Sequence, residues 1–185
     1  MKPDPELLRE IGINSTNVES GWGGAGNDLA RGLQSWTRSM IGRDQAVAVR
    51  AALMACALVI DRYKPDRPGL PPRAYLDEML TRIRRWLDEP TREHTEAVRS
   101  QLDVTRNAHA WQQASDVESF WILDAVDHAS LAVWTGQRAS YIVPTDYATT
   151  AARAITCVLH AMLDAGLAED AAVESIVGAI ESAAA

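Results

Sequence analysis

The feature that most constrains the fold is the placement of residues that cap or stop helices, which divide the chain into segments of helical length. Between these points apolar residues recur with the period of about 3.6 residues that is typical of an amphipathic helix. An alternating strand pattern does not recur, and the stretch 141–143 cannot form a sheet alone. The sequence therefore predicts an all-α, multi-helix bundle of six to eight helices, with stacked helical hairpins as the alternative arrangement.

The N-terminal part, residues 1–42, is predicted to hold two helices joined by a glycine-rich loop. Asp4 opens the first helix and Gly12 ends it, whereas Asn27 or its neighbour caps the second. We expect this part to pack on a main helical bundle formed by residues 43–185.

The main bundle is predicted to contain six helices, each with its own start and stop signals. Asp44 caps the first of them, whose broad apolar surface is typical of a central helix. Pro90 ends the second, and a capping box of Ser115 and Glu118 opens the fourth. The predicted ranges are 44–63, 71–89, 91–109, 115–135, 146–165 and from 167 to the C-terminus.

Charge and hydropathy limit the compartment and the classes of partner that we expect for this protein. The formal net charge is −7, without the basic stripe that is typical of a nucleic-acid binder. No apolar run approaches the roughly 20 residues that span a bilayer, and the N-terminus MKPDPELLREIG lacks the apolar core of a signal peptide. We therefore expect a cytoplasmic protein that binds neither nucleic acid nor membrane. Its acidic surface can attract a basic protein partner.

The two cysteines, Cys56 and Cys157, lie in apolar helical segments far apart in sequence. Such residues are more often buried thiols than a disulfide, and two of them in apolar surroundings do not suggest a zinc site. His160 follows Cys157 by three residues, but the segment AITCVLHAML lacks the exposed, electropositive setting of a catalytic thiol. The sequence thus predicts no cofactor and no catalytic residue.

Asp124 and His128 are the main candidates for polar chemistry within a helix. Because they are four residues apart, they share one helix face and can share a hydrogen bond. Together with Glu118 they are the candidate ligands of a metal-binding bundle. The second Glu-x-x-His motif that di-iron bundles use is missing, so we expect a packing pair and no metal.

The segment GWGGAGND, residues 21–28, precedes a helix but lacks the lysine that follows the glycines of a phosphate-binding loop. It is therefore predicted to be a connector. The chain has six tryptophans, most of which fit helix crossings in a core. An exposed tryptophan is a common anchor of a protein interface, and Trp22 and Trp134 are the candidates for partner binding.

The proline-rich stretch YKPDRPGLPP is predicted to end one helix and to start the next. Asp66 and Arg67 are expected to brace this joint through local hydrogen bonds and charge pairing. The arginines of the following helix are expected to form a solvated face that nearby carboxylates balance: Arg82, Arg84 and Arg85.

Several segments within residues 52–136 resemble a helical family of immunity proteins that bacteria make beside polymorphic toxins. The resembling parts are ALMACALVIDRY, then PDRP, then a helix that ends in RIRRWL, and further on DAVDHASLAVWTG. In that family an aspartate and an Arg-Pro pair likewise lead into a helix with an arginine and a tryptophan near its end, and the matching residues, expected to form a structural joint, are Asp66, Arg67, Pro68 and Trp86.

The same resemblance implies a non-enzymatic activity, in which the protein binds a toxin of the same cell and neutralises it by occluding its active surface. The implied partner is a protein, and a basic toxin would suit the acidic balance of the chain. Two other functions stay open. One is a structural or regulatory helical subunit of a bacterial assembly, and the other is a metal-binding or enzymatic bundle that uses Asp124 and His128.

Overall fold

The computed structural model describes residues 2–15, 27–42, 44–64, 70–108, 117–134 and 146–185. These parts form eight α-helices and one 3-10 turn, with no strand among them, so the predicted all-α, multi-helix fold is confirmed. The helices are α1 (Pro5–Asn14), α2 (Asp28–Ile41), α3 (Gln45–Ala57), α4 (Arg73–Asp88), α5 (Arg92–Ala108), α6 (Val117–Trp134), α7 (Tyr147–Asp164) and α8 (Glu169–Ala184), and the turn η1 spans Ile60–Arg62.

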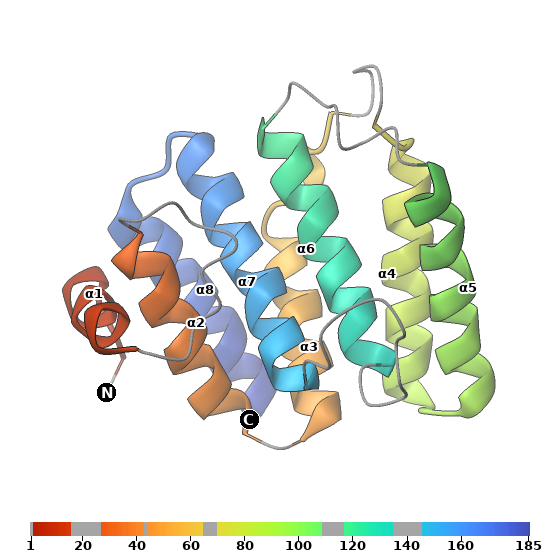
Figure 1. Cartoon of the computed structure of the whole chain (residues 1–185), viewed down its shortest axis with the longest axis horizontal. Coiled ribbons are helices and arrows are strands. Elements are labelled where there is room, and N and C mark those ends of the chain that lie inside the picture. The colour runs from red at the N-terminus through yellow and green to blue at the C-terminus, as the bar shows by residue number, and fades with distance from the viewer. Residues whose placement is uncertain (1, 16–26, 43, 65–69, 109–116, 135–145) are drawn as a thin grey trace.

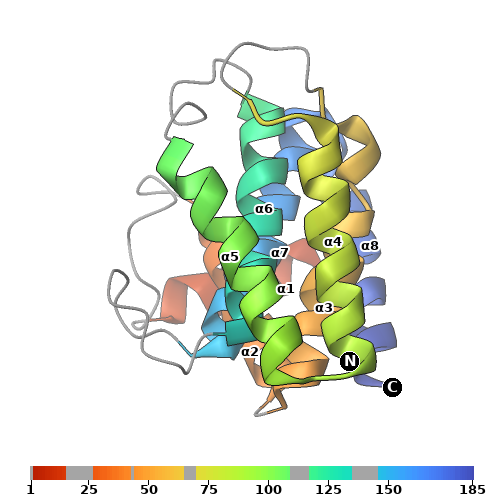
Figure 2. The same cartoon turned by 90° about the vertical axis from the view of Figure 1, so that its right-hand side faces the viewer.

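The helices form a bundle with α3, α6 and α7 at its centre. In Figure 1, α1, α2 and α8 lie at one end of this centre, and α4 and α5 lie at the other. Figure 2 looks onto the second end and shows α4 and α5 in front of α6. The central helix α3 contacts α4, α6, α7 and α8. Such contacts between helices far apart in sequence describe a bundle, whereas a stack of hairpins joins mainly neighbours in sequence.

The core consists of long aliphatic side chains with many alanines between them. Alanine lets helix axes approach closely, which suits the contact of α3 with α7. On α3 and α7 the alanines Ala52, Ala151 and Ala154 are fully buried. The largest fully buried side chains come from α1, α2 and α4 to α8: Leu8, Leu33, Leu76, Met79, Ile83, Leu102, Ile122, Leu123, Ile155, Leu159, Ile176 and Ile180.

Side-chain caps begin the helices where the sequence predicts them. In each case a carboxylate or amide oxygen accepts a hydrogen bond from a backbone N–H two or three residues further on, which satisfies a donor that the helix itself cannot pair. The caps are Asp4, Asn27, Asp44 and Asp146, at distances of 2.7–3.2 Å.

Two glycines end helices as well. Gly42 and Gly166 follow α2 and α7 with φ values of 65° and 84°, in the left-handed region where glycine carries no steric penalty. Gly12, however, does not end the first helix, which continues to Asn14. It lies at the crossing of α1 and α2, where an added Cβ would overlap the carbonyl oxygen of Asp28. Close packing, not helix termination, explains this glycine.

The third helix also ends earlier than the predicted limit at Tyr63. After Ala57 the backbone hydrogen bonds join residues three apart in place of four, and the 3-10 turn η1 follows. Arg73 of α4 donates to the carbonyl oxygen of Ile60 at 2.7 Å, and the Tyr63 hydroxyl donates to the carbonyl oxygen of Pro71 at 2.6 Å. The start of α4 therefore satisfies and fixes the turn.

Within the described ranges, no helix is both long and apolar enough to cross a membrane.

Candidate functional site

The main candidate site is a buried polar cluster, which we define as Asp124 and His128 of α6 with Cys157 of α7. Helices α6 and α7 pack against each other along their length, and both present mostly apolar and small residues at this contact. Asp124 is only 4% exposed and the Cys157 residue 6%, while the side chain of His128 is 12% exposed. The cluster is thus a polar inclusion in an apolar helix contact.

Asp124 is the centre of the cluster. The Cys157 thiol donates to its Oδ2, with 3.3 Å between sulfur and oxygen. His128 Nδ1 lies 2.9 Å from the backbone carbonyl oxygen of Asp124 and 3.5 Å from its Oδ1. Because a carbonyl oxygen can only accept, Nδ1 carries the hydrogen in this arrangement. The predicted pairing of Asp124 with His128 is therefore present.

The protonation states follow from burial and from the Asp124 carboxylate. Burial lowers the pKa of His128, but the hydrogen bonds and charge of Asp124, with a further contribution from Asp127, outweigh it and raise that pKa above its ordinary value. Burial and the same carboxylate raise the pKa of Cys157 well above that of a free thiol. The Cys157 thiol is therefore protonated near neutral pH and is not an activated nucleophile.

The other cysteine is also a buried, free thiol, as the sequence predicts for both. Burial raises the pKa of Cys56 to about 12. The helical segment around Cys157 is apolar, as predicted, but in the fold Asp124 of another helix also meets its sulfur.

A second buried carboxylate lies one turn along the same helix. Asp127 is 2% exposed, and the hydroxyl of Tyr75 on α4 donates to its Oδ1 at 3.2 Å. This bond crosses from α6 to the end of the bundle formed by α4 and α5, and so it connects the buried cluster's helix to that end.

Glu118, the third metal-ligand candidate, is not brought to the cluster. It lies in the first turn of α6, and Arg62 Nε donates to its Oε1 at 2.6 Å. This ion pair ties the start of α6 to the turn η1 that follows α3. In its place the fold supplies Cys157, so that one oxygen, one nitrogen and one sulfur atom lie within 4.8 Å of one another.

The tryptophan candidates have different outcomes. Trp134 is 8% exposed, and the Arg99 guanidinium carbon lies 5.5 Å from its ring centroid. The exposure that made Trp134 a candidate anchor is therefore not found. Trp86 is buried, and its Nε1 donates to Thr95 Oγ1 at 3.1 Å, which joins α4 to α5. Other predicted residues lie outside the described ranges: Trp22, Asp66, Arg67, Pro68 and Ser115.

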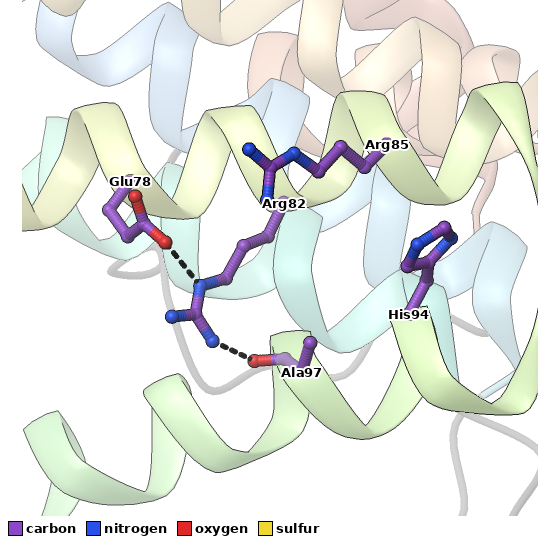
Figure 3. A pocket seen from close by; sticks show the side chains of 5 residues that line it. All are labelled: Glu78, Arg82, Arg85, His94 and Ala97. Carbon is purple, nitrogen blue, oxygen red and sulfur yellow. Dashed lines mark hydrogen bonds and ion pairs between the residues drawn. The ribbon is translucent and has the colours of Figure 1, made fainter.

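The arginine-rich helix α4 lines a pocket of about 170 Å³ together with α5, shown in Figure 3. Arg82 Nε donates to Glu78 Oε1 at 2.7 Å, and its Nη1 donates to the carbonyl oxygen of Ala97 on α5 at 2.6 Å. Its side chain is 26% exposed. Arg84 and Arg85 are exposed, as predicted. Arg82 differs from the prediction because it bridges two helices.

A wider, acidic hollow of about 430 Å³ lies where α1 and α8 begin. We call it the acidic hollow and define it by its four exposed carboxylates, Asp4, Glu6, Glu169 and Asp170. Arg9 also lines it and forms an ion pair with Glu169. The hollow combines residues from opposite ends of the chain, so no local sequence signal could have revealed it.

The described residues thus form an all-helical bundle with a buried Asp–His–Cys cluster and the acidic hollow on its surface. Comparison of the chain with protein-family models, with characterised proteins and with solved structures gives no significant match in any of the three.

Proposed function

We propose that the protein is a bacterial, cytoplasmic binding protein that neutralises a basic toxin of the same cell by occlusion. The resemblance of residues 52–136 to helical immunity proteins suggests this class of function. The acidic hollow is the observation that carries the proposal, because it offers a basic partner a concave surface of opposite charge.

The charge of the hollow is uneven in a way that suits a basic partner. It presents four carboxylates and one guanidinium, and that guanidinium is already paired with Glu169. Carboxylates grouped on a concave surface concentrate a negative potential, which speeds the association of a positively charged protein.

Helix stabilisation is a competing reason for these acids. Acidic side chains near helix N-termini stabilise a helix by about 0.3–1 kcal/mol each, and Asp4 also caps α1. Charge reversal distinguishes the two roles. If the acids stabilise helices, reversal lowers the free energy of unfolding. If they bind a partner, reversal lowers the association rate with a basic protein.

The experiment has two arms. In the first, the product of each gene that flanks the gene of this chain is expressed in a test bacterium, with and without this chain. The proposal requires one of these products to be basic and toxic, and growth to return when this chain is present. Absence of rescue from every flanking product would contradict the proposed function.

The second arm measures association of that toxin with the Glu6→Lys/Asp170→Lys double variant. Because the variant reverses two charges of the hollow, we expect association to slow by at least about tenfold at low salt and its salt dependence to flatten. The matched control is Asp88→Lys/Glu93→Lys, which reverses two exposed carboxylates at the opposite end of the bundle. Equal slowing in both variants would show that net charge, and not the hollow, steers the partner.

A further inference from the structure

We propose that Asp124, His128 and Cys157 form a binding site for a divalent transition metal ion of the zinc class. The site would use a carboxylate oxygen, an imidazole nitrogen and a thiolate sulfur, from two helices that already pack together. This proposal is independent of the proposed binding of a toxin.

The spacing of the three side chains suits such an ion. Zinc bonds of about 2.0–2.3 Å in a tetrahedron place neighbouring ligand atoms about 3.3–3.8 Å apart. Here Cys157 Sγ lies 3.3 Å from Asp124 Oδ2, and His128 Nδ1 lies 3.5 Å from Asp124 Oδ1. All three ligand atoms lie within 4.8 Å of one another, so the side chains need to move little. Three protein ligands leave a fourth position for water.

Charge balance favours the binding of a divalent ion by the cluster. A carboxylate and a thiolate carry two negative charges, which one divalent cation neutralises in a place where an unpaired charge is costly. In the structure the Cys157 thiol donates a hydrogen bond to Asp124 and the His128 imidazole lies beside it, which compensates the carboxylate in part. The metal would replace this partial compensation with direct bonds to all three groups.

Binding of the ion changes the protonation of two side chains, Cys157 and His128. The Cys157 thiol loses its proton to solvent, because the thiolate is the ligand. His128 binds as the neutral ring with its hydrogen on Nε2: a protonated ring loses its Nδ1 proton to solvent, a neutral ring moves its hydrogen to Nε2, and Nδ1 then binds the metal in place of its hydrogen bond to the Asp124 carbonyl oxygen. No oxidation state changes.

The donor set also selects the kind of metal. Thiolate and imidazole ligands prefer Zn²⁺ and related transition metals, whereas Mg²⁺ and Ca²⁺ prefer sets made of oxygen atoms. The partly exposed side chain of His128 marks the edge of the cluster that solvent can reach.

The test uses the purified full chain and Co²⁺, a coloured substitute for Zn²⁺ that reports thiolate ligation by a charge-transfer band. We expect one Co²⁺ per chain, with this band, and its loss when Zn²⁺ is added. Cys157→Ser should abolish the band and weaken binding at least about 100-fold, since removal of even a supporting group of a metal site costs about 10–100-fold. The serine hydroxyl can still donate to Asp124, so the fold should survive.

Two further variants complete the design. His128→Gln should weaken Co²⁺ binding by a similar factor, with the helical circular dichroism signal unchanged. Cys56→Ala is the matched control, because it removes the other buried thiol and should keep the band and the stoichiometry. The proposal is wrong if the unmodified chain shows no thiolate band at saturating Co²⁺, or if Cys157→Ser binds Co²⁺ as tightly as the unmodified chain does.

Discussion

The two ends of the bundle pair their helices in opposite ways. At one end α1 crosses α2 through Gly12 and Gly32, where an added Cβ would overlap backbone carbonyl oxygens of the facing helix. At the other end α4 meets α5 through large side chains, Trp86 and Arg82, and leaves a pocket between them. Each pair joins consecutive helices, but residues 89–91 connect α4 to α5, whereas the longer segment 15–27 connects α1 to α2.

The contrast shows that two helix contacts in one small protein can be stabilised in different ways. The contact of α1 with α2 depends on the absence of two side chains, so it responds to added volume. The contact of α4 with α5 depends on the presence of long side chains, so it responds to lost volume and lost hydrogen bonds. Substitutions that add volume should therefore destabilise the contact of α1 with α2, and substitutions that remove volume should destabilise the contact of α4 with α5.

The largest effect is expected for Trp86→Ala. The substitution empties the space of a buried indole between α4 and α5 and leaves Thr95 without its donor. We expect the free energy of unfolding to fall by about 3–5 kcal/mol, as measured by urea denaturation. Trp86→Phe keeps most of the ring and should cost less than half as much. A loss below about 1 kcal/mol for Trp86→Ala would show that the large side chain does not support this end.

Next in size is Gly32→Ala. The new methyl group would overlap the carbonyl oxygen of Leu8, so α1 and α2 must separate. We expect a loss of about 3 kcal/mol in the free energy of unfolding, again from urea denaturation.

The matched control for this substitution is Gly178→Ala, in the interior of α8. An added Cβ there meets nothing within 4 Å. Because alanine favours the helix over glycine, we expect a gain of about 0.5–1 kcal/mol. If both alanine variants stabilise the chain, close backbone approach does not hold α1 against α2.

The smallest effect is expected for Arg82→Met, which keeps the apolar stem and removes the guanidinium. The variant loses the pair with Glu78, whose side chain is 46% exposed, and the bond to the Ala97 carbonyl oxygen. We expect a loss of about 1 kcal/mol, since exposed ion pairs contribute little. Arg84→Met, on the exposed face of the same helix, should change stability by less than about 0.5 kcal/mol. Equal effects would assign Arg82 to the solvated face after all.

Local signals in the sequence predicted the helices well. A cap such as Asp44 or a stop such as Gly166 acts through hydrogen bonds and dihedral angles within a few residues, so its effect can be read from the chain alone. Gly12 carries the same local signal as Gly166 but serves a helix crossing. Only the position of α2 distinguishes the two roles.

The candidate site was predictable only in the part that lies on one helix. Asp124 and His128 share a face of α6 by their spacing, and that pairing is present. Cys157 lies 33 residues further along the chain than Asp124, and apolar neighbours surround it in sequence. Which carboxylate a buried thiol meets depends on how two helices dock, and no periodicity within either helix encodes that.

The hydrogen bond between Asp124 and Cys157 also helps to fix the position of α6 along α7. Contacts rich in alanine fit together at several offsets with similar packing, because their surfaces are smooth. A shift of one helical turn, about 5.4 Å, would move the carboxylate away from its thiol into apolar surroundings. A buried charge without its donor is costly, so the cluster penalises the wrong offsets. Together with the bond from Trp121 Nε1 to Asp164 Oδ2, this polar contact favours a single alignment of α6 and α7.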